Sequence, residues 1–294
     1  MIKALLMSLV MLACGAPLAG TATETAQRHD FREREEINQK FQLAAGAKVE
    51  VSSIRGHVDI GNSENDMAEV QIIRTARTRA DLEYHKIAVE HSGNSLVVRG
   101  IQEREDRRRA NIQVDHHVIL KLPRRIDLAI NSISGHLKAG DVDGEVRVNS
   151  ISGNASIGNV SGKLNVKSIS GTLDAGEIGA DVRVNSVSGN VRLSQVNGSV
   201  DVLSVSGTVN ARLVSLSPPG IHIRSVSGSV EIGFQSDVNA DFTADGISGQ
   251  VYLEVPNVVR DNEVKEPNVR ARIGAGGTLI EISSVSGNIR LTRT

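Results

Sequence analysis

The chain has 294 residues, with 33 Lys and Arg against 34 Asp and Glu, so its net charge is close to zero. Nucleic-acid-binding proteins usually carry a basic excess on one face, so we expect no nucleic-acid partner. Aromatic residues make up 2% of the chain and Trp is absent, which disfavours the aromatic platforms of many sugar-binding and single-strand-binding surfaces. The single cysteine, Cys14, excludes an intramolecular disulfide and a cysteine-based metal site.

The N-terminus has the pattern of an export signal. Lys3 supplies a positive charge, and residues 4–13 form an apolar run that only one serine interrupts. That run is shorter than the ~20 residues of a membrane-spanning helix and fits the apolar region of a signal peptide. Two processing routes remain open. Residues 1–22 are a signal peptide whose cleavage releases a soluble protein, or residues 1–13 are a lipoprotein signal and Cys14 becomes an acylated first residue.

An internal repeat is the main signal of the chain. The motif Ser-Ile-Ser-Gly or Ser-Val-Ser-Gly recurs every 18 residues from Gly135 to Gly207, and a weaker half-repeat lies midway, so the unit is nine residues. In each unit the third, seventh and ninth positions are apolar and alternate with polar ones, which is the period of a β strand. The fifth position is nearly always Gly, which marks a bend or a place with no room for a side chain. The glycines that end the motifs are Gly135, Gly153, Gly171, Gly189 and Gly207, followed at wider spacing by Gly228, Gly249 (as Gly-Ile-Ser-Gly) and Gly287.

An odd repeat of nine reverses the inward and outward directions of side chains unless each corner absorbs one residue. The polar first two positions, such as Asn131-Ser132, can do this because Ser and Asn readily form local turn hydrogen bonds. Two nine-residue sides per coil predict an all-β fold, a single-chain β-solenoid (β-helix) with 18-residue coils stacked ~4.8 Å apart. The predicted internal ladders are Val146, Leu164, Val182 and Val200 on one side, and Leu137, Ala155, Leu173, Val191 and Val209 on the other.

The main alternative arrangement is an antiparallel meander in which each 18-residue unit is a hairpin. One coil buries about six aliphatic side chains, worth ~2 kcal/mol each, whereas ordering its backbone costs ~1–2 kcal/mol per residue. A single coil therefore needs stacked neighbours on both sides. We prefer the solenoid because nearly identical units favour stacking like on like.

The repeat also divides the rest of the chain into parts. Residues 23–35 are polar and predict a tether. Residues 36–125 contain short strand-like segments without the strict repeat, and predict an irregular β-rich cap over the open end of the stack. Residues 126–294 predict the solenoid, and a charged stretch at 256–277 predicts a loop excursion before a last coil.

The serial Ser-[Ile/Val]-Ser-Gly-x-[Val/Leu] units from Ser132 to Leu291, preceded by a matching lead-in from Phe41 to Gly56, carry a family resemblance. They resemble the bacterial putative-adhesin family of β-strand-repeat proteins, domain of unknown function 4097. The resemblance covers residues 36–294. It implies an exported β-helical protein, and it implies no catalytic residues because none is established for the family.

Signatures of metal sites and cofactors do not stand out in the repeats. Calcium-binding nonapeptide rolls need Gly-Gly-x-Gly-x-Asp turns, whereas the acidic residues near these corners, Asp141, Asp143 and Glu177, are scattered. His116 and His117 are neighbours in a predicted strand, so their side chains should point to opposite faces and not chelate one ion. We predict no metal ligands and no cofactor.

Catalytic signatures do not stand out either. Polysaccharide-cleaving β-helices cluster Asp, or Asp with Lys and Arg, on one face, whereas the outward positions here mix charges from coil to coil. The repeated serines, such as Ser134 and Ser152, have no recurrent His or acidic partner. We predict no catalytic residues, and we expect Asp174 and Arg192 to form a surface ion pair worth ~0–1 kcal/mol. The predicted outward residues are Lys138, Ser156, Asp174, Arg192 and Asn210 on one side, and Arg147, Asn165, Arg183 and Asp201 on the other.

These features favour a non-enzymatic exported cell-envelope protein, structural or adhesin-like, whose β-solenoid surface binds an envelope protein or a glycan. We expect it in the periplasm or at the outer membrane and cell surface, with membrane contact only through a lipid anchor at Cys14. The insertions at 212–220 and 256–277 are candidates for a partner-specific surface. The alternatives are a carbohydrate-active β-helix enzyme, which rests on fold analogy alone, and a periplasmic envelope-stress or sensing scaffold.

Overall fold

The alternation of apolar and polar residues in each nonapeptide produces strands that bury one side and expose the other. In the computed structural model, the described residues form 22 strands of one continuous sheet and one short helix. No helix within the described residues is long and apolar enough to cross a membrane. The predicted export signal, Cys14 and most of the predicted tether lie outside the described residues. The described ranges are 33–102, 114–186, 188–245, 248–261 and 268–294.

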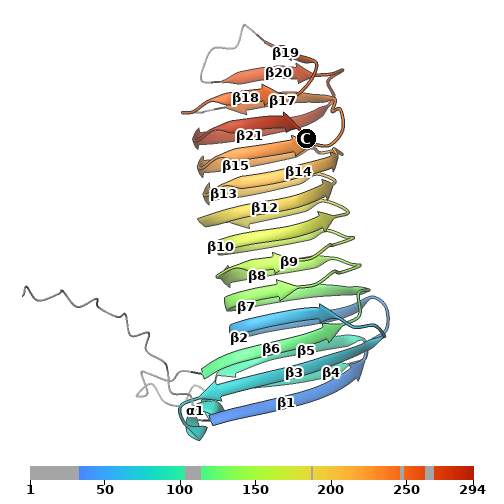
Figure 1. Ribbon diagram of the computed structural model, residues 1–294, viewed down its shortest axis with the longest axis vertical. Helices are drawn as coiled ribbons and strands as arrows, with labels where there is room; N and C mark the ends of the chain where they lie inside the picture. Colours follow the sequence, from blue (N-terminus) through green and yellow to red (C-terminus); the bar gives the residue numbers. More distant parts are fainter. Residues whose placement is uncertain (1–32, 103–113, 187, 246–247, 262–267) are drawn as a thin grey trace, which may run out of the picture. The chain divides into compact units, whose positions relative to one another are not determined.

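The front face of the sheet contains the strand segments that follow the motif glycines (Figure 1). It begins with two antiparallel pairs, β1 with β3 and β3 with β6, and from β6 onward its neighbours run parallel. In spatial order the front face is β1 (Glu33–Gln42), β3 (Met67–Ala76), β6 (Val114–Leu122), β2 (Ala47–Asn62), β7 (Ile126–Ala139), β9 (Ala155–Ile157), β10 (Leu164–Ile178), β12 (Ser188–Asn197), β14 (Val209–Ser215), β16 (Val230–Phe234), β22 (Ile289–Arg293) and β18 (Val251–Glu254).

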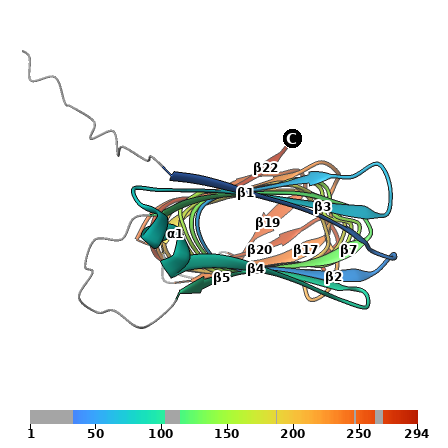
Figure 2. The same ribbon diagram turned by 90° about the horizontal axis from the view of Figure 1, so that it is seen from below.

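The back face lies opposite the front face, and the two enclose one apolar core (Figure 2). The long strands β2, β7 and β10 bend at the corner and contribute to both faces. In spatial order the back face is β4 (His85–Ser92), β5 (Ser95–Gln102), β2, β7, β8 (Val146–Ser152), β10, β11 (Val182–Ser186), β13 (Val200–Ser206), β15 (Ile221–Ser227), β21 (Thr278–Ser286), β17 (Ala240–Asp245), β20 (Val269–Ile273) and β19 (Val258–Arg260).

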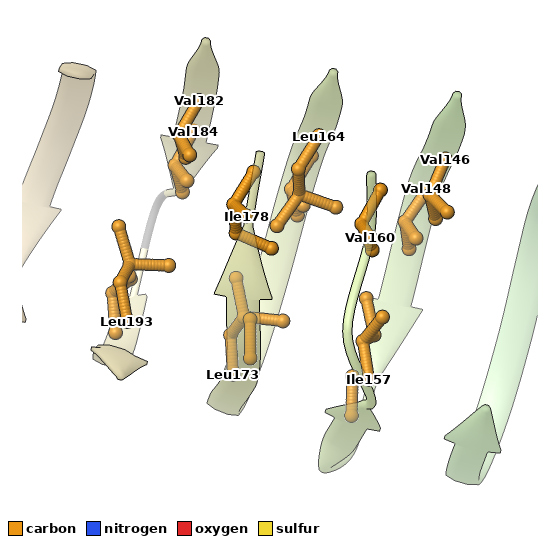
Figure 3. Close-up of a cluster of buried hydrophobic side chains, with 14 of the residues drawn as sticks. Val146, Val148, Ile157, Val160, Leu164, Leu173, Ile178, Val182, Val184 and Leu193 are labelled. Carbon is orange, nitrogen blue, oxygen red and sulfur yellow. The ribbon is translucent and has the colours of Figure 1, made fainter. Parts of the chain in front are cut away.

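The predicted β-solenoid and both predicted ladders are confirmed. Val146, Leu164 and Val182 are register partners on the back face, and the ladder continues to Val200. The front-face ladder from Leu137 to Val209 has the same 18-residue step. These pairs are parallel, which excludes the antiparallel meander for the repeats. Figure 3 shows part of this core, in which aliphatic side chains of successive coils lie over one another.

The corners absorb one residue, as the period of nine requires. Ile130 and Ile133 are both buried. Side chains of a regular strand alternate between its two faces, so residues three apart would normally point in opposite directions. The inward direction therefore shifts across the two residues between them. A similar shift separates Ala139 from Val142, both buried, at the opposite corner.

The motif glycines stack directly on one another and form what we call the glycine column. Gly171 has φ of +146°, and a Cβ there would lie 2.1 Å from the carbonyl oxygen of Gly153 in the preceding coil. A side chain would therefore meet both backbone strain and a steric clash. In stacking order the column is Gly56, Gly135, Gly153, Gly171, Gly189, Gly207, Gly228, Gly287 and Gly249.

The N-terminal cap is smaller than residues 36–125. Strand β2 is in register with β7 along nearly its whole length, so residues 47–62 already form the first coil. The remainder of the cap uses antiparallel strands and helix α1 (Arg79–Tyr84), which begins with a capping box of Thr78 and Asp81 and buries Leu82. Strand β1 starts at Glu33, so the end of the predicted tether is also a strand.

The C-terminal segment differs from a last coil added in sequence order. Strand β21 pairs with β15 on one side and β17 on the other, and β22 likewise lies between β16 and β18. The coil formed by 278–293 is therefore inserted between two earlier coils (Figure 1). The predicted excursion at 256–277 contains the antiparallel strands β19 and β20, and its residues 262–267 lie outside the described residues.

Candidate functional site

Parallel register places equivalent outward side chains of the front face in continuous rows. One row, which we call the polar row, consists of the residue that directly follows each glycine of the glycine column. It also includes His117, the register partner of His57 on β6. Neighbouring members are separated by the inter-strand spacing, ~4.8 Å. Apart from its histidines, the row consists of uncharged amides and hydroxyls. Its members in order are His117, His57, His136, Asn154, Thr172, Asn190, Thr208, Ser229, Asn288 and Gln250.

Hydrogen bonds to the corner backbone hold part of the polar row in place. The Asn154 Oδ1 atom accepts a hydrogen bond from the backbone N–H of Thr172, at 3.1 Å. Asn190 accepts one from Thr208, and Asn288 accepts one from the backbone N–H of Gln250, each at 3.1 Å. These amides satisfy backbone donors where the strand ladder is interrupted. The side chains of the row are therefore arranged by the fold itself.

On each face, outward side chains of opposite charge form ion pairs between neighbouring coils. The predicted pair is present, with Arg192 Nη1 at 2.7 Å from Asp174 Oδ1. On the back face Arg183 Nε lies 3.0 Å from Asp201 Oδ2. All four side chains are largely exposed, so each pair contributes ~0–1 kcal/mol. This pattern is typical of a solvated surface.

Three histidines gather at the β6, β2 and β7 end of the polar row. The rings of His57 and His136 are stacked, with centroids 5.3 Å apart and planes 6° apart. The ring of His117 meets that of His57 edge-on at 6.0 Å, and its Nε2 lies 2.7 Å from Asp59 Oδ2.

The sequence shows these three histidines far apart, so their proximity was not predicted. The available signal was the repeat alignment, because His57 and His136 each follow a column glycine. His117 follows His116, which occupies the register position of the column glycine on β6. The expectation that His116 and His117 point to opposite faces is confirmed, since His116 is buried and His117 is outward and partly exposed.

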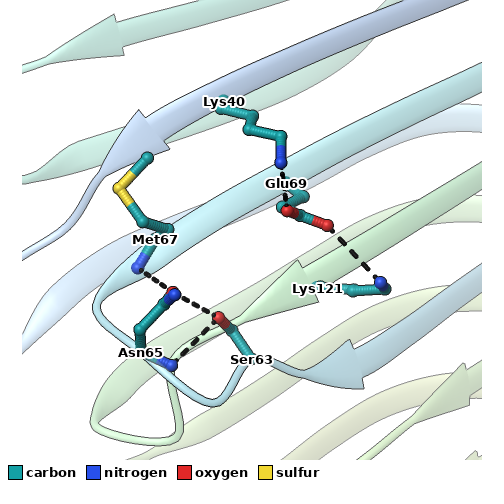
Figure 4. Close-up of polar contacts among 6 residues, drawn as sticks. All are labelled: Lys40, Ser63, Asn65, Met67, Glu69 and Lys121. Carbon is teal, nitrogen blue, oxygen red and sulfur yellow. Dashed lines mark hydrogen bonds and ion pairs between the residues drawn. The ribbon is translucent and has the colours of Figure 1, made fainter.

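A shallow cavity of about 300 Å³ lies on the outer surface of β1, β3 and β6. Its central carboxylate is Glu69, which contacts Lys40 at 2.5 Å and Lys121 at 3.4 Å (Figure 4). The hydrogen bond from Lys40 lowers the pKa of Glu69, and that from Asn38 lowers the pKa of Glu36. Both carboxylates are therefore held ionised, whereas a glycosidase needs one acid with a raised pKa.

A second cavity, of about 190 Å³, opens on the back face over β11 and β13. Here Ser199 Oγ donates a hydrogen bond to Asp181 Oδ1 at 2.8 Å, and Lys163 Nζ lies 3.1 Å from Asp181 Oδ2. The hydrogen bonds from Ser199 lower the pKa of Asp181, followed by the contribution of Lys163. A carboxylate with a lowered pKa is a poor general base, so this serine is not activated as a nucleophile.

A buried polar cluster closes the core at its N-terminal end. Arg74 donates hydrogen bonds to the carbonyl oxygens of Leu82 and His85, at 2.9 and 2.7 Å, and forms an ion pair with Glu35. His116 Nδ1 lies 3.1 Å from the carbonyl oxygen of Arg55, so Nδ1 carries the proton and donates it. Burial lowers the pKa values of His116 and His85. The cluster fixes the end of the stack and faces the interior.

One of the two predicted partner-specific insertions adjoins a third cavity. Residues 212–220 end strand β14 and turn at the corner, next to a cavity of about 370 Å³ that Phe234 and Thr278 also line. The other insertion, 256–277, supplies β19 and β20. Their role in partner binding stays a prediction.

Residues 46–292 match the profile of Toastrack DUF4097. The chain belongs to this family. The sequence-based resemblance is thus confirmed over nearly the whole described region, and the Toastrack domain is a β-solenoid fold. No curated protein matches the Toastrack chain.

Several solved structures are similar to this Toastrack protein. A putative adhesin from Parabacteroides distasonis is 13% identical, with 87% of this chain and 97% of that chain covered and a TM-score of 0.46. A putative adhesin from Bacteroides fragilis is also 13% identical, with the same coverage and a TM-score of 0.42. A structure described as a putative lipid binding protein, also from P. distasonis, is 8% identical, covers 87% of this chain and 96% of that one, and has a TM-score of 0.30.

Proposed function

We propose that this Toastrack protein is an exported, non-enzymatic, adhesin-like protein of the cell envelope that binds an extended glycan or protein along its front face. The observation that carries the proposal is the polar row, which repeats hydrogen-bonding side chains at the strand spacing over successive coils. A periodic row suits a polymer better than a small molecule, because each coil contacts the next unit of the same ligand. The predicted export signal, residues 1–22 or a lipoprotein signal at 1–13, supports an envelope location.

The electrostatics of the described surface support a binding role over a catalytic one. Glu69 lines the front-face cavity, and Glu36 accepts hydrogen bonds from its lining residues Asn38 and Gln71. The pKa values of both carboxyls are lowered, which favours their ionised form. The serine in the back-face cavity, Ser199, donates to a carboxylate that is a weak base. If the folded protein releases reducing ends from a panel of acidic and neutral polysaccharides, the proposal is wrong and the carbohydrate-active alternative replaces it.

The binding face is tested by placing charge on the polar row. Thr172 and Thr208 are outward hydroxyl residues, so we expect Thr172→Lys with Thr208→Lys to weaken capture of the partner while the fold is kept. The control is Asn185→Lys, an outward position on the back face. Capture is measured against isolated peptidoglycan, cell-surface polysaccharides and solubilised envelope proteins. Equal capture by the double variant and the native chain would contradict a front-face site.

We also propose that export ends in one of two mature forms. Cleavage after the small residues near Ala22 leaves a soluble protein, and the lipobox route leaves an acylated Cys14. Mass spectrometry of the N-terminal peptide separates the two forms, and Cys14→Ser should abolish membrane attachment only in the lipidated case. An unprocessed N-terminus in the cytoplasm would contradict export.

A further inference from the structure

The histidine end of the polar row has the spacing of a metal-ligand set. His57 and Asp59 lie two residues apart on β2, so both point to the outer side of the front face. His117 is the direct register partner of His57 on β6. Side chains two apart on one strand start ~7 Å from each other, and directly opposed side chains start ~5 Å apart. Long polar side chains at these three positions can reach one point above the sheet.

Two of the three side chains already converge. His117 Nε2 and Asp59 Oδ2 are 2.7 Å apart, and their side chains are 40% and 46% exposed. No three His, Cys, Asp or Glu side chains in the described ranges converge on an ion position as they stand. The ring of His57 is exposed and lies 6.0 Å from that of His117. An exposed side chain changes rotamer readily, and the proposed site requires His57 to do so. We propose that His57, His117 and Asp59 bind one divalent transition-metal ion.

The ligand types define the class of ion. Two imidazole nitrogens and one carboxylate oxygen suit Zn²⁺, Ni²⁺ or Cu²⁺, whereas Ca²⁺ and Mg²⁺ require sets of oxygen ligands. His136 is stacked on His57 at 5.3 Å and is the nearest further nitrogen donor. The site lies on an open surface, so water occupies the positions that the protein leaves free. The ion site shares His57 and His117 with the polar row, but the ion is titrated without any glycan or protein ligand, so its test does not depend on the proposed function.

A positive charge beside the site provides a second test, in which a substitution should strengthen metal binding instead of weakening it. Lys138 is the direct register partner of Asp59 on β7. A cation at that distance opposes the binding of another cation through Coulomb repulsion. Removing the charge with Lys138→Gln should therefore strengthen metal binding. A hydrogen bond between His117 and Asp59 that serves the fold alone predicts no such effect.

The experiment is calorimetric titration of the untagged full-length chain with ZnCl₂ and, separately, NiCl₂. All variants carry Cys14→Ser, so that the single thiol does not bind the ion. We expect one ion per chain, and about tenfold or greater weakening in His57→Asn and in His117→Asn. The control is His91→Asn, which removes another exposed histidine, the one stacked on Phe41. Its affinity should equal that of the starting chain, and Lys138→Gln should bind more tightly.

Two results would overturn the proposal. One is the absence of saturable binding of either ion to the starting chain. The other is a loss in His91→Asn as large as that in His57→Asn. Urea midpoints of all variants confirm that each is folded, and His57→Gln replaces His57→Asn if the latter has a lowered midpoint.

Discussion

The glycine column depends on a missing Cβ atom, and this makes its contribution measurable at single residues. At Gly171 a Cβ would clash with the backbone of Gly153 and the backbone φ is +146°. We expect Gly171→Ala to lower the free energy of unfolding by about 3 kcal/mol or more, because strain and overpacking add. Urea denaturation of the variant measures this loss.

Two further glycines separate the two causes. Gly93 has φ of +57° with nothing within 4 Å, so Gly93→Ala should cost only about 1 kcal/mol of backbone strain. Gly61 has no positive φ, and a Cβ there would lie 3.9 Å from the carbonyl oxygen of Leu120. Gly61→Ala should therefore leave the free energy of unfolding unchanged or raise it by about 0.5 kcal/mol. Equal effects at Gly171 and Gly93 would show that the stacked carbonyl is not the cause.

His116 should make the stability of the fold depend on pH. Burial lowers the pKa of His116 below its ordinary value of 6.5, and burial lowers that of His85 as well. Below pH 6.5 the unfolded chain therefore binds more protons than the folded chain, and acidification favours unfolding. The stability that the neutral histidines contribute to the fold is fully present above pH 6.5. It is lost as the pH falls through their folded-state pKa values.

The urea midpoint measured from pH 8 to pH 5 tests this dependence. We expect the midpoint to decrease as the pH is lowered below 6.5. The corresponding free energy of unfolding should decrease by at most about 1.4 kcal/mol per pH unit for each histidine. The His116→Gln variant should show a shallower fall. A variant profile parallel to that of the native chain would contradict the assignment to His116.

The inward residues of the repeats were predictable from the sequence, whereas the surface cluster was not. Val146 and Leu164 follow a strict period, so their direction and partners can be read from the spacing. His57, His117 and Asp59 meet across two strands whose connecting chain lacks the repeat. Their proximity depends on the pairing of β2 with β6, which no period in the sequence indicates.

At the scale of elements, the inserted C-terminal coil should be protected from hydrogen exchange. Strand β21 has paired neighbours on both sides, and Ile280 and Ile282 are fully buried. We expect their amides to exchange about as slowly as those of Ile221 and Ile223 in β15, although 278–293 is close to the chain end. Exchange measured by mass spectrometry gives the rates. Faster exchange in β21 than in β17 would indicate stacking in sequence order.

The order of these coils could not be predicted because the repeats resemble one another. Residues 240–254 and 278–292 have the same alternation and contain a column glycine each, so either fits on the coil that ends at Phe234. The period determines the shape of a coil and not its place in the stack. The strand segments of the cap were predicted, but their antiparallel pairing was not, since residues 63–125 carry no repeat to align.

At the scale of the whole molecule, the ends of the stack are closed by different means. Helix α1 and the buried polar cluster around Arg74 close the N-terminal end, and the strands β19 and β20 extend the back face at the other end. Repeat arrays need such atypical ends because an open coil exposes both apolar surface and an unpaired strand edge. The edge strand β1 carries five charged residues among its first eight, which disfavours edge-to-edge association. The outward faces are thus the surfaces available for recognition.

We propose that the protein is exported and presents its front face to a partner outside the cell. Antibody labelling of intact cells, compared with permeabilised cells, tests this claim most directly. We predict strong labelling of intact cells by an antibody against residues 33–294. Labelling only after permeabilisation would contradict the adhesin-like function and would favour a periplasmic scaffold or sensor instead.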